Sequence, residues 1–561
     1  MLVHELFQYE ALRILNFTCH GAATNLRRTV LVRPDATAHN AAEIHAAMPQ
    51  HIIDSAFIRH DTLVAMARGT DRFAYAPAAL QRLQADRAVV QQHIADGAPV
   101  YGLNTGLGGN LGYRLDADEV VAYQQQIILG RMIGMGEPLP MDVVRAAQLV
   151  RVIGFARGGT GVSPQAAQAV MDLLDHGITP LVPMRGSISA GDLGLCAHMA
   201  APVIGQGEAW YQGRRLTGAQ ALDAAGLAPV ALQAKDGLGL INASPLTTGY
   251  AAVAACELAD LLLVGAAVAA LADEGYAANL TVFDPRIAAA RPAGAQSAVA
   301  TLFRALLEGS ALAEQPPRAI QDAISFRTMA QVFGAGHAAF AHLCEAVDTE
   351  INGTSDNPLV FAAEQQMLSS PNFHPPMIAL TFDSMAIALV QLATAGAQRM
   401  IKLQTAHLSG LPKYLSPVGG ASTGFNSLQK TVAALHAEIR LKATPASLDA
   451  LVVSETVEDH ATHAMLCVRK LHEQLELMRA LVAIEAMVAA QAVDLRGGAQ
   501  LGRGTQAVFD AVRSAVPMLQ ADRPSGPDAM RVQAALFGKD LARQLRDALR
   551  PVMAGHALRA L

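Results

Sequence analysis

Charged residues are scarce in this chain. Asp, Glu, Lys and Arg make up 16% of its 561 residues, whereas apolar residues make up 52%. A chain with so little charge must hide much of its surface, so we expect a large core and extensive contacts between subunits. The net charge is −6 and no basic block occurs, which makes nucleic acid and anionic membranes poor partners.

Cysteine is also rare, and no two cysteines form a C-x-x-C pair. The five residues are Cys19, Cys196, Cys256, Cys344 and Cys467. This pattern argues against a disulfide framework and a thiolate zinc site, and is typical of a reducing compartment. A secretory signal is not expected, because Glu5 and Glu10 interrupt the start of the chain. The best membrane candidate, residues 261–272, is too short to span a bilayer. We therefore expect a cytoplasmic protein.

Hydrophobic periodicity divides the chain. Residues 250–272 and 459–492 are rich in Ala and Leu with a period near 3.6, which predicts long helices that pack as an antiparallel bundle. Strand signals are few and short. The predicted fold is mainly α and has four parts. Residues 1–50 are an extension of uncertain order, or an artefact if the protein starts at Met48. They are followed by a part with glycine-rich active-site loops (51–245), a long-helix bundle (246–500) and a C-terminal helical segment (501–561).

Taken singly, the polar motifs have ordinary interpretations. The glycine-rich run 102–109 lacks the Gly-Lys-Ser/Thr ending and the strand-helix frame of a phosphate site. His460 and His463 are close in sequence but have no evident third ligand, so Glu458 and Asp459 beside them favour a polar helix start over a metal site.

Four further residues are equally unremarkable alone. Tyr101 would more often be a packing residue than a base, since a phenol needs nearby cations to lower its pKa from about 10. Lys402 reads as a solvated lysine. Glu438 and Lys442 have the i,i+4 spacing of a helical ion pair.

Eight motifs taken together and in order resemble the histidine and phenylalanine ammonia-lyase family, over roughly residues 55–500. They are Y-G-L-N-T-G-L-G (101–108), R-G-S-I-S-A-G-D-L (185–193), K-D-G-L-G-L-I-N (235–242), S-F-R-T-M-A-Q-V-F-G (325–334), S-D-N-P-L-V-F (355–361), N-F-H (372–374), L-S-G-L-P-K-Y-L (408–415) and E-D-H (458–460).

The resemblance implies an aspartase/fumarase-like helical fold and a homotetramer whose active sites are built from several subunits. Members eliminate ammonia from an aromatic L-amino acid without an external cofactor. An Ala-Ser-Gly triplet cyclises into a methylidene-imidazolone electrophile that captures the amine, while a tyrosine removes the β-proton. By position, Tyr101 matches that base, Asn242 an asparagine near the electrophile, Arg327 the arginine that holds the carboxylate, and Glu438 a glutamate that faces the amine or ring. Asn372 of the N-F-H motif is a further candidate for substrate binding.

The chain departs from the family around the chemistry. The family reads G-S-V-G-A-S-G-D-L, whereas this chain reads G-S-I-S-A-G-D-L and is one residue shorter. The triplet before Asp192 is Ser189-Ala190-Gly191, and alanine has no hydroxyl to lose. Ile324 replaces a family tyrosine, Arg131 replaces a histidine, and Lys402 stands in a usually apolar stretch. The sequence therefore predicts a site that has lost its electrophile and gained cations, with no cofactor and no metal.

Without the electrophile, the substrate nitrogen must already be a good leaving group. A quaternary ammonium leaves as a neutral amine, and among histidine-like compounds ergothioneine carries one. We therefore expect an ergothionase-like lyase that releases trimethylamine and leaves thiourocanate. Tyr101 is the expected base, Arg327 the carboxylate anchor, Lys402 and Glu438 the groups that activate the thioimidazole ring, and Arg131 a cation that lowers the pKa of Tyr101.

Two alternatives stay open. One is a histidine or other aromatic amino acid ammonia-lyase with an electrophile built irregularly from Ser189. The other is a catalytically inactive tetrameric scaffold that binds a metabolite.

Overall fold

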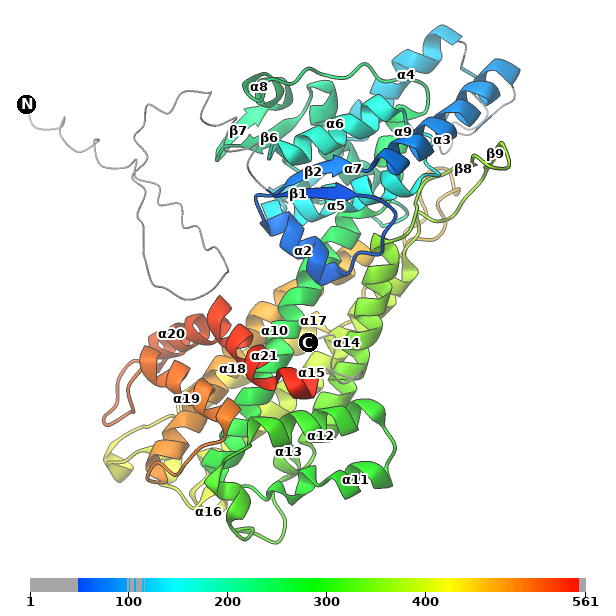
Figure 1. Ribbon diagram of the computed structural model, residues 1–561. Helices are drawn as coiled ribbons and strands as arrows, with labels where there is room; N and C mark the ends of the chain where they lie inside the picture. Colours follow the sequence, from blue (N-terminus) through cyan, green and yellow to red (C-terminus); the bar gives the residue numbers. More distant parts are fainter. Residues whose placement is uncertain are drawn as a thin grey trace, which may run out of the picture. The chain divides into compact units, whose positions relative to one another are not determined.

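Long helices make up the centre of the computed structural model, which describes residues 49–97, 100, 105–106, 113–115, 117–448 and 450–553 (Figure 1). The bundle consists of α10 (Pro245–Tyr276), α14 (Met329–Ile351), α15 (Pro376–Leu403) and α18 (Ala464–Leu495), with α17 (Leu428–Lys442) against α15 and α18. This confirms the prediction of a mainly α fold with a long bundle.

Helix α10 lies in the core because it is apolar on nearly every side. Its small residues let neighbouring helices approach closely. A Cβ on Gly249 would lie 2.5 Å from the backbone nitrogen of Ala147 in α5 (Met141–Arg157), and a Cβ on Gly275 would lie 2.9 Å from the carbonyl oxygen of Ala489 in α18. The glycines therefore set the spacing between α10 and its neighbours.

The remaining helices flank the bundle. The other helices of the N-terminal part are α2 (His60–Arg68), α3 (Pro77–Asp96), α4 (Ala117–Leu129), α6 (Pro164–Asp175), α7 (Leu193–Ala200), α8 (Gly218–Ala224) and α9 (Asp236–Ile241). Beyond α10 lie α11 (Pro285–Ala290), α12 (Gly294–Leu306), α13 (Ile324–Arg327), α16 (Ala406–Ser409), α19 (Arg503–Ala515), α20 (Ser525–Phe537) and α21 (Lys539–Met553).

The strands form small sheets of two or three members, as the few strand signals predicted. β1 (Gln50–Ile53) pairs in parallel with β2 (Arg72–Tyr75). The antiparallel pairs are β3 (Met135–Pro138) with β5 (Pro183–Arg185), β6 (Glu208–Tyr211) with β4 (Thr179–Pro180) and β7 (Arg214–Thr217), and β8 (Leu359–Phe361) with β9 (Gln366–Leu368).

Two sequence predictions about helices were wrong in detail. Helix α18 begins at Ala464, so Glu458 and Asp459 precede it and its first turn has no acid. The reason is a left-handed turn at His463, whose N–H donates to the carbonyl of Ile188. The membrane candidate at residues 261–272 was expected to be too short to span a bilayer, but it lies within one of two segments, Asp236–Tyr276 and Pro376–Leu403, that are long and apolar enough by length and composition. In the first segment, 83% of the apolar window is buried inside the protein.

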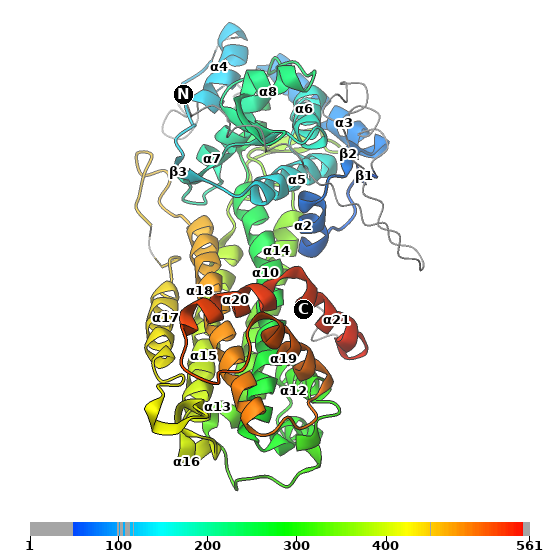
Figure 2. The same ribbon diagram turned by 90° about the vertical axis from the view of Figure 1, so that its left-hand side faces the viewer.

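Residues from Pro49 onward group into one unit, and the internal boundaries expected near residues 245 and 500 stay predictions. Within this unit α10 connects two regions that matter below. Thr247 near its start hydrogen-bonds Asp192, and Tyr276 at its end stacks on Phe326 with ring centroids 4.1 Å apart. At 1.5 Å per residue these contacts are about 44 Å apart along the helix. Figures 1 and 2 show α7 and α13 near opposite ends of the bundle.

Candidate active site

The loop between β5 and α7 carries the triplet Ser189-Ala190-Gly191, and Asp192 anchors this loop. The Asp192 carboxylate is fully buried and accepts hydrogen bonds from Ser187 Oγ at 2.7 Å, from Thr247 N at 2.8 Å and from Thr247 Oγ1 at 2.9 Å. Burial raises the pKa of Asp192, and these hydrogen bonds oppose the rise. The carboxyl therefore ties the loop to the start of α10.

Ser189 is turned into the interior. It has a positive φ of 58° and no exposed surface. Its Oγ accepts the N–H of Met465 at 2.9 Å, and its carbonyl accepts the hydroxyl of Thr462 at 3.0 Å. The Met465 N–H belongs to the first turn of α18, where backbone donors have no partner within the helix. Ser189 thus caps α18 from a distant segment.

Gly191 closes the loop in a conformation that suits glycine. Its φ is +72°, and a Cβ there would lie 2.6 Å from Leu193 Cδ1. Its N–H donates to the carbonyl of Phe373 at 3.0 Å, and the hydroxyl of Ser244 donates to the same carbonyl at 2.8 Å. Ala190 between Ser189 and Gly191 is half-buried. The N-F-H segment therefore forms one wall of the loop.

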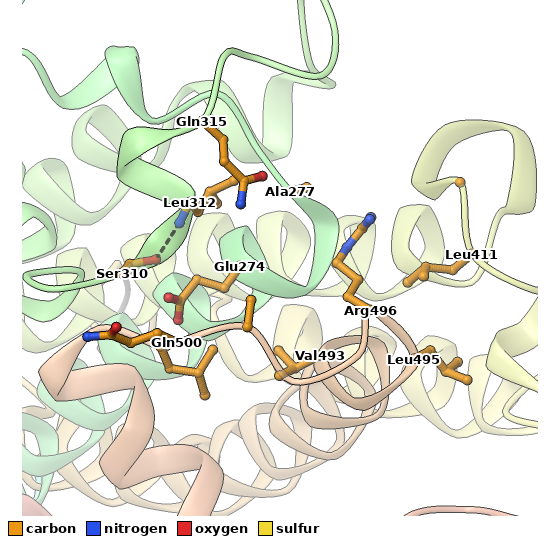
Figure 3. A pocket seen from close by; sticks show the side chains of 13 residues that line it. Glu274, Ala277, Ser310, Leu312, Gln315, Leu411, Val493, Leu495, Arg496 and Gln500 are labelled. Carbon is orange, nitrogen blue, oxygen red and sulfur yellow. Dashed lines mark hydrogen bonds between the residues drawn. The ribbon is translucent and has the colours of Figure 1, made fainter.

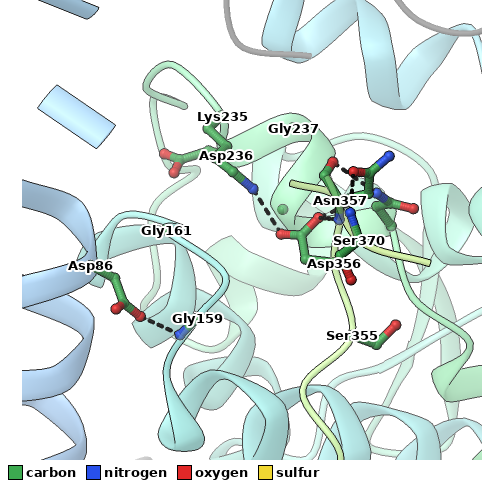
Figure 4. Close-up of polar contacts among 12 residues, drawn as sticks. Asp86, Gly159, Gly161, Lys235, Asp236, Gly237, Ser355, Asp356, Asn357 and Ser370 are labelled. Carbon is green, nitrogen blue, oxygen red and sulfur yellow. Dashed lines mark hydrogen bonds and ion pairs between the residues drawn. The ribbon is translucent and has the colours of Figure 1, made fainter. Parts of the chain in front are cut away.

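Asn242 lies directly after α9 and faces this loop. Its amide oxygen is 3.6 Å from the point where a Cβ on Gly191 would stand. Its Nδ2 donates to Asp356 Oδ1 at 3.3 Å and to the carbonyl of Asn357 at 3.2 Å. Asp356 also pairs with Lys235 at 2.9 Å, and both side chains are fully buried (Figure 4). This ion pair holds Asn242 in place.

Asn372 and Arg131 belong to the same region. Asn372 is exposed, and its Nδ2 donates to the carbonyl of Thr354 at 3.4 Å. Arg131 is half-buried just after α4, with Nη1 3.4 Å from the carbonyl of Ile127. The residues after Arg131 touch the loop, because a Cβ on Gly186 would lie 3.1 Å from the Cα of Gly134. We call Ser189, Ala190, Gly191, Asn242, Asn372 and Arg131 the loop group.

Arg327 and Lys402 lie at the other end of the bundle, and we call them the distal group. Lys402 is almost at the end of α15, which begins at Pro376 shortly after Asn372. Twenty-six residues of helix separate Pro376 from Lys402, or about 39 Å. Lys402 Nζ donates to Gln398 Oε1 at 2.6 Å, and Arg327 Nη1 donates to Gln321 Oε1. Within one chain, therefore, the structure does not bring the two groups together.

Glu438 lies between these groups on α17. It is exposed, and its neighbour His436 contacts Thr394 near the middle of α15 at 2.8 Å. The expected pairing of Glu438 with Lys442 was wrong, because Lys442 instead reaches across to Glu473 on α18. Tyr101, the predicted base, lies outside the described residues.

Two other features lie apart from the predicted site residues or lack a full ligand set. A cavity of about 340 Å³ lies between the ends of α10 and α18, lined by Glu274, Ser310 and Arg496 among others (Figure 3), but none of the predicted site residues lines it. His460 contacts His374 through ring nitrogens 2.8 Å apart. Across the described ranges no group of three His, Cys, Asp or Glu side chains could hold a metal ion.

Sequence reasoning missed the residues that hold the loop. Thr462 and Met465 contact Ser189 across more than 270 residues of sequence, and no local pattern indicates such a contact. The carbonyl of Phe373 is a backbone group that any residue carries. Lys235 could have been singled out, since a lysine inside an apolar motif suggests a buried partner.

Comparison with known proteins places these observations in a family. The aromatic amino acid lyase family matches residues 58–514. Histidine ammonia-lyase of Stigmatella aurantiaca is 37% identical over 513 residues, which cover 90% of this chain and 99% of that protein.

Solved structures agree. The ergothioneine-degrading enzyme ergothionase of Treponema denticola, in complex with desmethyl-ergothioneine sulfonic acid, superposes with a TM-score of 0.85 at 30% identity and covers 88% of this chain and 99% of its own. Histidine ammonia-lyase of Trypanosoma cruzi gives a TM-score of 0.82 at 28% identity, over 91% and 97% of the two chains. The resemblance seen in the motifs is thereby confirmed: this chain belongs to the aromatic amino acid lyase family and shares the ammonia-lyase fold.

Proposed function

We propose that this protein is an ergothionase-like carbon–nitrogen lyase that eliminates trimethylamine from ergothioneine to give thiourocanate. The observation that carries the proposal is the residue before Gly191. It is Ala190, which has no hydroxyl to eliminate, while the hydroxyl of Ser189 is taken by the N–H of Met465. The residues present do not fit a methylidene-imidazolone, so the proposed reaction has no step through one.

The chemistry of the leaving group explains how such a lyase works without the electrophile. A base takes the β-proton, the electrons of that C–H bond form the new double bond, and the electrons of the C–N bond leave with neutral trimethylamine. The thione ring accepts charge as the proton departs. A quaternary nitrogen has no lone pair with which to attack an electrophile, so the elimination from this substrate does not need one.

Tyr101 is our assignment for the base, from its place in the Y-G-L-N-T-G motif. It needs a cation nearby to lower its pKa from about 10. Arg131 supports this role because its segment packs against the triplet loop at Gly186. Asn242 and Asn372 are assigned to substrate contacts beside the loop.

Arg327 is assigned to the substrate carboxylate, because a guanidinium can hold both carboxylate oxygens at once. Lys402 and Glu438 are assigned to the thioimidazole ring, where the ammonium stabilises developing negative charge and the carboxylate moves a proton. Within the single chain, Arg327 and Lys402 lie at the far end of the bundle from the loop group, and Glu438 lies between the two groups.

We propose that a homotetramer joins the groups, with each site shared between chains. The exposed side of α15 supports this, because Met377, Leu380 and Ile387 leave 48–56% of their surfaces open on a helix that leads to Lys402. Ile324 in the turn of Arg327 is 61% exposed. Apolar surface beside polar candidates is typical of a subunit contact.

The cytoplasm is our proposed location. A reducing compartment suits the free thiols of the described chain, which are Cys196, Cys256, Cys344 and Cys467. A small aromatic betaine is the proposed partner, and no feature of charge favours nucleic acid.

The test is to incubate the purified protein with ergothioneine and separately with L-histidine, while recording the ultraviolet spectrum and assaying trimethylamine and ammonia. We expect trimethylamine and a red-shifted conjugated product from ergothioneine only. Tyr101→Phe and Lys402→Met should each lower turnover more than tenfold, about 1.4 kcal/mol or more of activation free energy. Lys430→Met, an exposed lysine on α17 that contacts Asn426, is the matched control and should keep full activity.

Histidine ammonia-lyase activity is the second candidate, favoured by the name of the 37% identical relative. Ammonia and urocanate from L-histidine, with an intact mass lower than the sequence mass by two waters, would establish it and overturn our proposal. Absence of any product from both substrates would instead favour the inactive scaffold.

A further inference from the structure

The orientation of Arg327 is not set by its own helix. Helix α13 is a single turn of four residues, Ile324–Arg327, and an isolated turn is unfavourable because it fixes many dihedral angles for one hydrogen bond. Neighbouring groups must therefore hold it. Phe326 does so on one side, being 1% exposed and stacked on Tyr276 at an interplanar angle of 16°.

Arg399 holds the turn on the other side. Its Nη1 donates to the carbonyl of Ser325 at 3.4 Å. Its Nε and Nη2 donate to the two carboxylate oxygens of Glu485 at 2.5 and 3.2 Å. Arg399 and Glu485 are each 2% exposed. The planar guanidinium is thus fixed by one fork-shaped ion pair and presents its remaining edge to the turn that carries Arg327.

Two neighbouring residues favour the pairing of Arg399 with Glu485. Gly396 lies one turn before Arg399, and a Cβ there would stand 2.6 Å from Glu485 Oε2. Its lack of a side chain is what lets the carboxylate sit against α15. Asp273 is a second buried acid close to Arg399, and burial raises its pKa well above the usual value. The raised pKa favours the neutral form of Asp273, which competes less with Glu485 for the cation.

Stability alone does not account for the pair. Removing two charges from water costs about as much as their attraction returns, and apolar residues of similar volume often replace a buried ion pair without loss. What apolar residues could not supply is a fixed N–H aimed at the Ser325 carbonyl. The pair is therefore better explained by what it orients.

We propose that Arg399 is a positioning residue for the substrate carboxylate: Glu485 fixes its guanidinium, the guanidinium fixes the Ser325 carbonyl, and the turn so held aims Arg327. The inference rests on the proposed function in one respect, the assignment of the carboxylate to Arg327.

The test uses the double variant Arg399→Met/Glu485→Met in the full-length protein, because two apolar residues of similar volume should preserve the fold. Calorimetry measures binding of two ligands that differ only in the carboxylate, ergothioneine and its decarboxylated analogue. We expect the affinity for ergothioneine to fall roughly tenfold, because a displaced Arg327 no longer holds both carboxylate oxygens at once, and the affinity for the analogue to stay unchanged. Arg327→Met should lose the same preference for the ligand with the carboxylate. Arg399→Lys keeps the charge but not the fork-shaped guanidinium, so its affinity for ergothioneine should lie between those of the wild type and the double variant.

The outcomes separate the two ideas. An unchanged preference for the carboxylate in the double variant, with Arg327→Met losing it, overturns the inference and leaves the function standing. Equal weakening of both ligands also overturns it, since the pair would then be structural only. If Arg327→Met keeps the preference, the carboxylate assignment is wrong and the inference falls with it. L-histidine and histamine serve as a second ligand pair, so that a failure of ergothioneine as substrate does not decide the matter.

Discussion

Replacing Ser189 with alanine tests whether this serine stabilises the fold or takes part in the reaction. In the structure its hydroxyl accepts the buried N–H of Met465 at 2.9 Å, in the first turn of α18. The variant leaves that donor without a partner. Loss of a helix-capping acceptor costs about 1–2 kcal/mol. Catalysis as proposed should be unaffected, because no atom of Ser189 takes part.

The assay has two readouts. Hydrogen exchange at the first turn of α18 reports local opening, and 1.4 kcal/mol corresponds to roughly tenfold faster exchange. Trimethylamine release reports chemistry and should stay within about twofold of the wild type, a change of less than 0.5 kcal/mol in activation free energy. Ser244→Ala is the matched control: it removes a hydroxyl beside the same loop that donates to the carbonyl of Phe373 rather than accepting from Met465, and it should leave exchange at α18 unchanged.

The reasoning is refuted if Ser189→Ala abolishes turnover while exchange at α18 stays slow. The serine would then be chemical, and a wild-type mass lower by two waters would identify an electrophile.

Three further predictions concern assembly, pH and burial. Arg131→Met and Arg327→Met should each be inactive alone but regain activity when co-expressed, because a shared site can take its loop group from one chain and its distal group from another; no recovery would argue against shared sites. Burial raises the pKa of Glu350 from 4.5 to about 7, so folding favours its protonated form. The contribution of this group to the free energy of unfolding is therefore highest below about pH 4.5, and it falls as the pH rises to about 7, because the buried carboxyl must then lose its proton. Glu350→Gln should therefore raise the unfolding temperature at pH 8 and not at pH 4, and an equal shift at both would contradict this assignment. Lys235→Met leaves Asp356 buried without its cation and should lower the free energy of unfolding by about 3–5 kcal/mol, measured as a loss of soluble protein or a lower denaturation midpoint; wild-type stability would show that the carboxyl takes up a proton instead.

The bundle was predictable because its signal is repeated many times over. Helix α10 carries an apolar residue on nearly every side for more than eight turns, and no single error changes that pattern. The start of α18 was not predictable, because His463 adopts a left-handed conformation in which its N–H donates to the carbonyl of Ile188. A long-range contact decided the boundary there, and local propensity did not.

The candidate site divides in the same way. The motifs identified Asn242 and the triplet. The two lie close together because Asn242 directly follows α9, and the triplet lies between β5 and α7 in the same region of the chain. The separation of Lys402 from that region follows from the length of α15, which residue patterns indicate only roughly. The link from Arg399 to Ser325 joins residues 74 positions apart, and only the structure reveals it.

The bond between Ser189 and Met465 has a consequence for how this chain could change over evolutionary time. An insertion that restored the family length of the loop would move the serine out of reach of α18 and uncap that helix, even as it rebuilt a triplet. Gaining an Ala-Ser-Gly triplet would therefore demand at least two coordinated changes, with a less stable intermediate between them. Under the proposed function, a loop of this length therefore favours keeping substrates that carry their own leaving group.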